Sequence, residues 1–253
     1  MSEDQLSEDI FNSSLVTRLS HSIRILTLKK CSSTQKLLID WWEKYAFKLD
    51  FTPVLHTSYQ YDGKGQKNRK WISNQGSLTY SLLLAPHTMP SWTPLEIAVL
   101  CRNFISDYCK LDLHLKWPND LVDHNHKKYG GIICHMRKQM VIVGIGLNLF
   151  PVPDSAFNDL QSGFLYSSSQ YCQQDTFLKL LLEYLVNNRI LNHLEIKMQW
   201  LKHCNHLNKT VQISENHHHH EGIFIGLGDF GEALIYDNHN VTHKITNGSL
   251  SFN

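Results

Sequence analysis

The sequence has almost no excess of charge of either sign. Its 24 Lys and Arg residues stand against 23 Asp and Glu residues, which leaves a net charge of +1 over 253 residues. A charge this small does not attract nucleic acid or an anionic membrane to the protein as a whole. Any electrostatic function must therefore come from a local cluster.

Paired cysteines and long apolar runs are also missing. The six cysteines are scattered without a Cys-x-x-Cys pair, which argues against a disulfide framework and favours reduced, mostly buried thiols. No apolar run approaches the roughly 18 residues that a membrane-spanning helix needs, and the chain starts with a polar, acidic segment. We therefore expect a cytoplasmic protein with no membrane partner.

Glycine and proline are scarce, at 13 and 7 residues, whereas hydrophobic types make up 42% of the chain. This composition indicates a globular protein with one large core and a smaller satellite domain. Hydrophobic periodicity predicts a strand at Ile23–Leu28 and a helix at Thr34–Tyr45, with Ser32, Ser33 or Thr34 as its cap. Phe51–Gln60 is rich in β-forming residues.

The middle of the chain alternates predicted strands and helices. The expected elements are a buried strand at Leu78–Ala85, a helix at Pro94–Tyr108, a strand leading to Trp117, and paired strands at Tyr129–Met136 and Met140–Leu149 with Arg137 and Lys138 at the turn. Helical spacing then runs from Thr176 to His203 and includes Leu194 and Met198 as apolar positions. From Lys209 onward, short strands at close spacing predict a small β-barrel of about 45 residues.

A basic loop lies between two apolar segments, within the range Tyr61–Gly76. Four cations stand there against Asp62, a local charge of +3: Lys64, Lys67, Arg69 and Lys70. Gly63 and Gly65 remove side chains where a backbone approaches a ligand, and the cations suit a phosphate group. The alternative is a solvated surface loop, because the segment fits neither a Walker A nor a Rossmann fingerprint.

Three further segments place polar or charged residues at the ends of apolar stretches. They are Lys116-Trp117-Pro118-Asn119-Asp120, Lys127-Lys128-Tyr129-Gly130-Gly131-Ile132-Ile133 and Gly144-Ile145-Gly146-Leu147-Asn148. Functional sites are commonly built at strand ends, and glycine in a strand often marks a close ligand approach. By itself, the first segment fits a plain turn equally well, and the second fits a hairpin rim. The third segment alone is weak evidence for a site.

Taken together and in this order, these segments resemble the biotin protein ligase family. The resemblance begins at Ser32-Ser33-Thr34-Gln35 and continues through Gln60, the loop from Gly63 to Trp71 and the three later segments. It covers about residues 24–150 and extends more weakly into the C-terminal strands.

The resemblance implies an α+β fold, in which a mixed β-sheet flanked by helices, like that of class II aminoacyl-tRNA synthetases, precedes a small SH3-like β-barrel. It implies a polar N-terminal segment at 1–22, a biotin- and ATP-binding catalytic domain at 23–206 and the SH3-like domain at 207–253. The expected enzyme is an AMP-forming ligase that uses ATP and Mg²⁺. It would convert biotin to biotinyl-5′-AMP, release pyrophosphate and biotinylate a lysine of a biotin carboxyl carrier domain.

The resemblance also implies roles for individual residues. The biotin-binding set is Ser33, Thr34, Gln35, Gln60, Gly63, Lys64, Gly65, Gln66 and Lys128. The ATP-binding set is Lys64, Lys67, Arg69, Trp71, Lys116, Asn119 and Asn148. The catalytic set is Lys128, Lys116, Arg69 and Asp120.

The reaction explains why these residue types are present. A carboxylate that attacks an α-phosphate joins two anions, so lysine and arginine reduce the repulsion and stabilise the developing charge. The carrier lysine, with an ordinary pKa of about 10.4, must lose a proton before it attacks. Asp120 is the candidate that orients or deprotonates it.

The loop departs from the commonest family pattern. Lys64 and Gln66 stand where arginine is frequent, and Asn68 stands where glycine is frequent. Gln35 likewise stands where the family often has asparagine. Because a neutral Gln66 cannot pair with the adenylate phosphate as arginine would, we expect weaker retention of the intermediate.

Two alternatives remain open from the sequence: a lipoate ligase or octanoyl transferase on the same core fold, and a biotin-binding scaffold without turnover. The residues before Ile23 are too few and too polar for a helix-turn-helix module, so no nucleic-acid partner is expected. No metal site is assigned, and the His217–His220 tract is interpreted as a solvated hairpin loop. The oligomeric state, a homodimer included, stays open.

Overall fold

The computed structural model describes residues 16–20, 23–45, 51–66, 69–152, 161–215 and 218–252. The chain divides into two compact units that do not follow chain order: residues 1–86 with 131–183, and residues 87–130 with 184–253. Within the described ranges, no helix combines the length and the apolar character needed to cross a membrane. The six cysteines, all of which are described, form no disulfide, and two of them, Cys31 and Cys101, are buried.

The first unit is built on a mixed sheet, as predicted. Its strands lie in the order β1 (Val16–Ser20), β2 (Ile23–Leu28), β3 (Thr52–Thr57), β4 (Ser77–Leu84), β8 (Met140–Asn148) and β7 (Lys128–Arg137), the last from Gly131 onward. β2 and β3 are parallel, whereas β1–β2, β3–β4 and β4–β8 are antiparallel pairs. A short 3₁₀ helix, η4, spans Ser169–Tyr171 in this unit.

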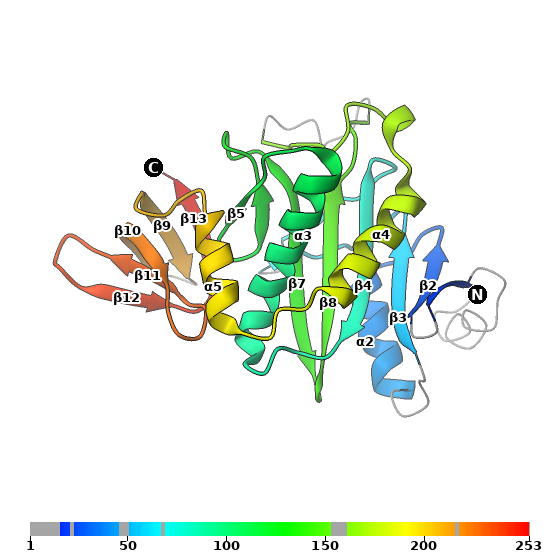
Figure 1. Ribbon diagram of the computed structural model, residues 1–253, viewed down its shortest axis with the longest axis horizontal. Coiled ribbons are helices and arrows are strands. Elements are labelled where there is room, and N and C mark those ends of the chain that lie inside the picture. The colour runs from blue at the N-terminus through cyan, green and yellow to red at the C-terminus, as the bar shows by residue number, and fades with distance from the viewer. Residues whose placement is uncertain are drawn as a thin grey trace. The chain divides into compact units, whose positions relative to one another are not determined.

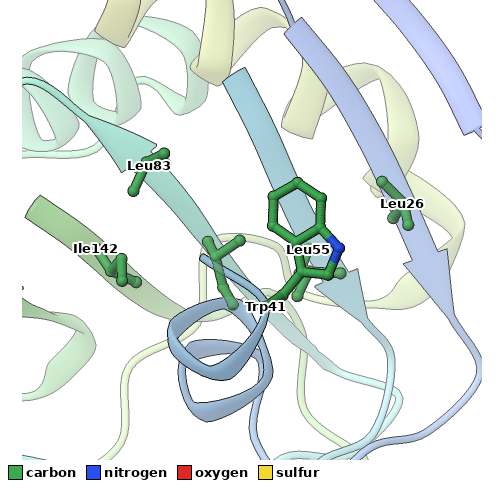
Figure 2. Close-up of a cluster of buried hydrophobic side chains, with 6 residues drawn as sticks. Leu26, Trp41, Leu55, Leu83 and Ile142 are labelled. Atoms are coloured by element: carbon green, nitrogen blue, oxygen red, sulfur yellow. The ribbon is translucent and has the colours of Figure 1, made fainter. Parts of the chain in front are cut away.

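Helices cover both faces of this sheet (Figure 1). α2 (Thr34–Tyr45) packs on one face, where Leu38 and Trp41 join a buried cluster with the strand residues Leu26, Leu55, Leu83 and Ile142 (Figure 2). Side chains alternate along a strand, so His56 points to the face opposite Leu55. The His56 ring nitrogen Nε2 lies 3.5 Å from the side-chain amide of Gln174, at the start of α4 (Gln174–Asn187), so α4 belongs to that opposite face.

The second unit holds a β-hairpin and two further helices. β5 (His114–Lys116) and β6 (Asp120–Val122) pair antiparallel. α3 (Thr93–Cys109) follows a short 3₁₀ helix, η3 (Pro90–Trp92), and α5 spans His193–Lys202. Pro94 lies in the first turn of α3, as its sequence position suggested, because a missing N–H costs nothing there.

A second, antiparallel sheet of five strands occupies the C-terminal part of this unit, consistent with the predicted SH3-like barrel. Its order is β12 (Thr242–Ile245), β11 (Ala233–Tyr236), β10 (His218–Leu227), β9 (Thr210–Glu215) and β13 (Ser249–Phe252). Val211, Ile213, Phe224 and Ile235 are fully buried and form the core of this small sheet.

The structure corrects some predicted elements. The helical stretch from 176 to 203 is two helices, because the Arg189 side chain and the Ile190 backbone N–H both bond the buried carboxylate of Glu96 at distances of 2.6 and 2.9 Å. Leu194 and Met198, expected among the apolar positions, are 61% and 65% exposed. β1, β6 (Asp120–Val122) and β12 were not predicted. Of the tract His217–His220, interpreted as a loop, His218–His220 belong to strand β10 and His217 lies outside the described residues.

Candidate functional site

A strip of small residues runs along strands β4 and β8 of the first unit. The strand register places Ser77, Thr79 and Ser81 opposite Asn148, Gly146 and Gly144, respectively. The next positions on the same face, Leu83 and Ile142, belong to the apolar cluster under α2. The face therefore changes from apolar to small and polar close to the start of α2.

The N-terminus of α2 carries a buried cluster of hydroxyl and amide groups. Ser33 is the cap, since its hydroxyl accepts a hydrogen bond from the Lys36 backbone N–H at 3.4 Å. The backbone N–H and the hydroxyl of Thr34 both donate to the Gln60 carboxamide oxygen, at 2.7 and 3.1 Å. The Thr34 hydroxyl also lies 2.8 Å from that of Ser81. Three predicted biotin-binding residues thus meet in one cluster that borders the small-residue strip.

Gln60 and Gln35 are both fixed by further contacts. The Gln60 backbone N–H donates to the Ser73 hydroxyl at 2.6 Å. The Gln35 amide nitrogen donates to the carbonyls of Ile133 and Ile142, at 3.1 and 3.3 Å, and so ties β7 to β8. Both N–H groups of Gln35 are engaged in this way, so its carboxamide oxygen is the atom left to meet a ligand.

The basic loop folds back on itself as a short hairpin. The Trp71 backbone N–H donates to the Gly63 carbonyl at 2.9 Å, and the Gly65 N–H donates to the Arg69 carbonyl at 2.6 Å. A Cβ atom at Gly63 would lie 2.5 Å from the Trp71 carbonyl oxygen, so this position requires glycine. Lys67, predicted to bind ATP, lies outside the described residues.

Charge in this loop is partly compensated at the surface. Lys64 Nζ lies 2.8 Å from Asp62 Oδ1, and both side chains are about half exposed. The hydrogen bond from Lys64 lowers the pKa of Asp62 below its ordinary value. Solvent screens this ion pair, so the Lys64 charge can be redirected to a phosphate at little cost.

Trp71 lies against the small-residue strip. A Cβ atom built at Gly146 would come within 2.6 Å of the indole carbon Cε2, so the ring lies directly on the glycine backbone. The indole Nε1 is buried and has no hydrogen-bond partner among the described residues. Asn148, two positions further along the same face of β8, completes a pair of residues that were both predicted to contact the nucleotide.

A second group of predicted residues lies in the second unit, at the turn of the β5–β6 hairpin. The register pairs Lys116 with Asp120 across the hairpin, and Asn119 in the turn is buried. Lys128 Nζ donates to Asp120 Oδ1 at 2.6 Å. The neighbouring Trp117, preceding a cis proline bond, is buried, and its indole N–H donates to the Gly231 carbonyl at 3.4 Å. Trp117 is therefore part of the packing of the second unit.

Sequence reasoning missed two polar residues of the first group, Thr79 and Ser81. The segment was interpreted simply as a buried strand, although the alternation of Ser77, Thr79 and Ser81 with apolar residues signals one polar face. The Thr79 hydroxyl and the Ser32 hydroxyl are buried without a partner among the described residues, which marks them as groups that can meet a ligand. Among those same residues, no group of three or more His, Cys, Asp or Glu side chains is arranged to hold a metal ion.

Comparison with known proteins agrees with this geometry. Residues 30–148, which include the α2 cluster, the basic loop and the ends of the strip, match the biotin/lipoate A/B protein ligase family. These residues form a domain of that family.

Two relatives of this domain are biotin--protein ligase 1, chloroplastic, of Arabidopsis thaliana and the bifunctional ligase/repressor BirA of Bacillus subtilis. They are 32% and 33% identical to this chain over 108 residues, which are 38% and 39% of this chain. The match spans only 29% and 33% of the lengths of these two relatives.

Solved structures extend the likeness beyond the family domain. The biotin protein ligase of Aquifex aeolicus in complex with biotin and ATP is 26% identical, covers 90% of this chain and 97% of its own length, and superposes with a TM-score of 0.71. The biotin acetyl coenzyme A carboxylase synthetase of Helicobacter pylori is 19% identical, covers 88% of this chain and 99% of its own, and has a TM-score of 0.67. At that lower identity the second likeness concerns the fold alone.

Proposed function

We propose that this protein is a biotin protein ligase, which activates biotin with ATP to biotinyl-5′-AMP, releases pyrophosphate, and transfers biotin to a lysine of a biotin carboxyl carrier domain. The observation that carries the proposal is the buried cluster of Thr34 and Gln60 on a strip of small residues, with the Trp71 indole in close contact with Gly146. The membership of residues 30–148 in the ligase family and the likeness to the Aquifex aeolicus enzyme in complex with biotin and ATP support it.

Biotin would bind at the start of α2. Its ureido group presents one carbonyl and two N–H groups, so it needs both donors and acceptors in a buried place. Ser33, Thr34 and Gln60 provide hydroxyl and amide groups there, with Gln35 beside them, next to a strip without large side chains. The loop residues Gly63, Lys64, Gly65 and Gln66 would cover the ligand.

ATP would use the other end of the strip and the basic residues. Trp71 would pack on the adenine, and Asn148 would hydrogen-bond to it. The phosphates would be bound by Lys64, Lys67, Arg69, Lys116 and Asn119. Mg²⁺ would arrive with ATP, because it commonly keeps phosphate oxygens and waters as ligands. We assign no protein side chain to this ion.

In the first half-reaction, a carboxylate oxygen of biotin forms a bond to the α-phosphorus, and the bond from that phosphorus to pyrophosphate breaks. Lys128, Lys116 and Arg69 would reduce the repulsion between the two anions and stabilise charge on the phosphoryl oxygens. The 2.6 Å hydrogen bond from Lys128 to Asp120 holds the lysine ammonium in one direction.

In the second half-reaction, the neutral amine of the carrier lysine attacks the acyl carbon and AMP leaves. Asp120 is our candidate for orienting or deprotonating that amine. Its carboxylate already accepts a hydrogen bond from Lys128, which favours the orienting role over full proton removal. The carrier domain is thus the proposed macromolecular partner.

The test is pyrophosphate release from ATP, measured with biotin and with lipoate in parallel and followed by transfer to a biotin carboxyl carrier domain. We expect release that depends on biotin, and label on the carrier lysine. Release with lipoate alone would assign the protein to the lipoate branch of the family. Biotin binding without any pyrophosphate release would identify a scaffold without turnover.

A further inference from the structure

The aromatic ring of Phe252, at the end of β13, carries two contacts from the region of the β5–β6 hairpin. Lys116 Nζ lies 5.5 Å from the ring centroid. The imidazole of His126 stacks on Phe252 with the centroids 3.8 Å apart and the planes 22° from parallel. A cation within about 6 Å of an aromatic centroid is attracted by the negative charge on the face of the ring. Phe252 therefore restrains the direction of the Lys116 ammonium group.

This arrangement is anchored on both sides. Phe252 pairs with Val211 of β9 through the second sheet. The His126 Nδ1 atom lies 2.8 Å from the Asn205 amide nitrogen, and Asn205 Oδ1 lies 3.0 Å from Nδ1 of the buried His206.

The strand that carries Lys116 is tied to the same chain segment. The backbone N–H of Leu115, its neighbour, donates to the His203 carbonyl at 2.8 Å, and the Leu115 carbonyl accepts from the Asn205 N–H at 3.3 Å. The Phe252–His126 stack and the strand that carries Lys116 are thus both tied to residues 203–206. Backbone and side-chain hydrogen bonds to this segment together fix where Phe252 and Lys116 lie relative to each other.

A contact with an aromatic ring has a specific advantage for a lysine that must bind phosphate. It orders the flexible stem before ATP arrives, which reduces the entropy lost on binding. Unlike a carboxylate, an aromatic ring does not neutralise the ammonium charge.

We propose that Phe252 is a positioning residue that directs Lys116 toward the phosphate groups of ATP. The second sheet then contributes to nucleotide binding through its strand β13. This inference rests on the proposed function, because it assumes that Lys116 serves ATP.

The test compares Phe252→Leu with Phe252→Tyr and Phe252→Trp in the full chain. Leucine keeps apolar bulk but has no π face, whereas tyrosine and tryptophan keep one. We expect Phe252→Leu to raise the KM for ATP about three- to tenfold, as loss of one cation–π contact predicts. The KM for biotin and the melting temperature should change little, and the two aromatic variants should behave like the wild type.

Two controls separate positioning from a general structural role. Phe230→Leu changes a phenylalanine of the same unit that is 64% exposed, and it should leave the KM for ATP unchanged. In a double-mutant cycle, Phe252→Leu should add nothing further to the defect of Lys116→Ala, because the ring acts through that lysine. Additive defects, or a wild-type KM for ATP in Phe252→Leu, would overturn the inference.

A direct measurement distinguishes failure of this inference from failure of the proposed function. Protons on Cε of Lys116, assigned by their loss in Lys116→Ala, should resonate upfield in the wild type because the adjoining Nζ lies over the Phe252 ring. The shift should vanish in Phe252→Leu. If the wild type releases no pyrophosphate with biotin and the upfield shift is present, the proposed function fails and the geometry stands. If the shift is absent, the positioning role fails whatever the enzyme does.

Discussion

The ion pair between Lys128 and Asp120 orients the lysine ammonium group but contributes little to the stability of the fold. Their side chains are 41% and 23% exposed, so solvent screens the pair, and its net contribution to folding is small. The 2.6 Å hydrogen bond nevertheless fixes where the ammonium points. We therefore expect substitutions here to change catalysis much more than folding.

The first prediction concerns Lys128→Ala. Removing one charged contact from a desolvated transition state costs about 2 to 4 kcal/mol, which slows adenylate formation by roughly 30- to 1000-fold. The melting temperature should stay close to that of the wild type. The measurement is single-turnover pyrophosphate release at saturating biotin. Lys127→Ala is the matched control, and wild-type release in Lys128→Ala would move the role to Lys127.

The second prediction concerns Gln66, whose carbonyl accepts the Arg69 backbone N–H at 3.1 Å within the loop hairpin. A hydrogen bond to a charged group contributes roughly 1.5 to 3 kcal/mol, against about 1 for a neutral pair. Gln66→Arg should therefore lengthen the lifetime of bound biotinyl-adenylate. Loss of radiolabelled biotin from both proteins, timed without a carrier, measures it. Equal off-rates would show that other residues hold the phosphate.

Most residues of the candidate site could be named from the sequence, but their contacts could not. Thr34, in the motif Ser32-Ser33-Thr34-Gln35, and Gln60 are 26 residues apart in the sequence. Only the parallel pairing of β2 with β3 brings them together. Ser81 joined the cluster through strand register, which no local pattern fixes. The roles assigned to these residues stay predictions.

Strand β8 has glycines at alternate positions because different neighbours lie on each of them. A Cβ atom at Gly146 would come within 2.6 Å of the Trp71 indole, whereas one at Gly144 would meet the Gln35 amide at 3.1 Å. The first neighbour is a rigid ring and the second is the end of a flexible side chain. The two glycines therefore differ in what a methyl group would displace.

The third prediction follows from this difference. Gly146→Ala should push Trp71 from its place and raise the KM for ATP, by roughly five- to 100-fold if base stacking on the ring is lost. Gly144→Ala is the control on the same strand, and its KM for ATP should change little. Steady-state pyrophosphate release at varied ATP measures both. Similar ATP affinities in the two variants would exclude Trp71 as a stacking residue.

Helix α3 is joined to the segment before α5 by a buried ion pair. Glu96 is fully buried, and Arg189 binds it through two parallel hydrogen bonds of 2.6 and 2.9 Å. The fourth prediction is that Glu96→Ala lowers the free energy of unfolding by about 3 to 5 kcal/mol, because Arg189 keeps a buried charge without its carboxylate.

Urea denaturation at neutral pH measures this loss. Asp112→Ala is the control: Asp112 also pairs with an arginine, Arg102, at 3.7 Å, but its side chain is 75% exposed. That variant should lose less than about 1 kcal/mol. Equal losses in the two variants would show that burial does not set the strength of the Glu96 pair.

The same contact explains why element boundaries were the least predictable part of the fold. The apolar periodicity from 176 to 203 is helical throughout and outweighs the local signal of the break, the N-cap Asn192 of α5, while Glu96 bonds the segment between the two helices from a distant helix. By contrast, the bounds Ile23–Leu28 and Thr34–Tyr45 were predicted correctly, because local signals define that strand and the capped helix. β12 is four residues long and mixes polar with apolar types, so the sequence pattern did not predict it as a strand.

Stability of the whole protein should depend on pH through a buried histidine. His206 is fully buried, with its ring 4.3 Å from that of Phe224. Burial, with the charges of Lys116, Lys209 and His126, lowers its pKa to about 3. The ordinary histidine pKa of about 6.5 applies to the unfolded chain. Between these two values the unfolded state binds more protons than the folded state, so acid favours unfolding.

The last prediction is therefore that the contribution of His206 is complete above pH 6.5 and declines as the pH falls toward about 3. At pH 4.5 it should have cost about 2 to 3 kcal/mol of the free energy of unfolding relative to pH 7. His203, whose pKa is lowered to about 4, chiefly by burial, acts in the same direction. Urea denaturation of the wild type and of His206→Gln across this range measures the difference in slope.

Two results separate titration from simple loss of packing. His206→Gln should be less stable than the wild type at pH 7 but should lose less stability on acidification, because the glutamine does not take up a proton. Ile235→Ala removes a fully buried side chain from the same small sheet and should lower stability while keeping the wild-type dependence on pH. A parallel dependence in His206→Gln and the wild type would mean that His206 is not the group whose protonation accompanies unfolding.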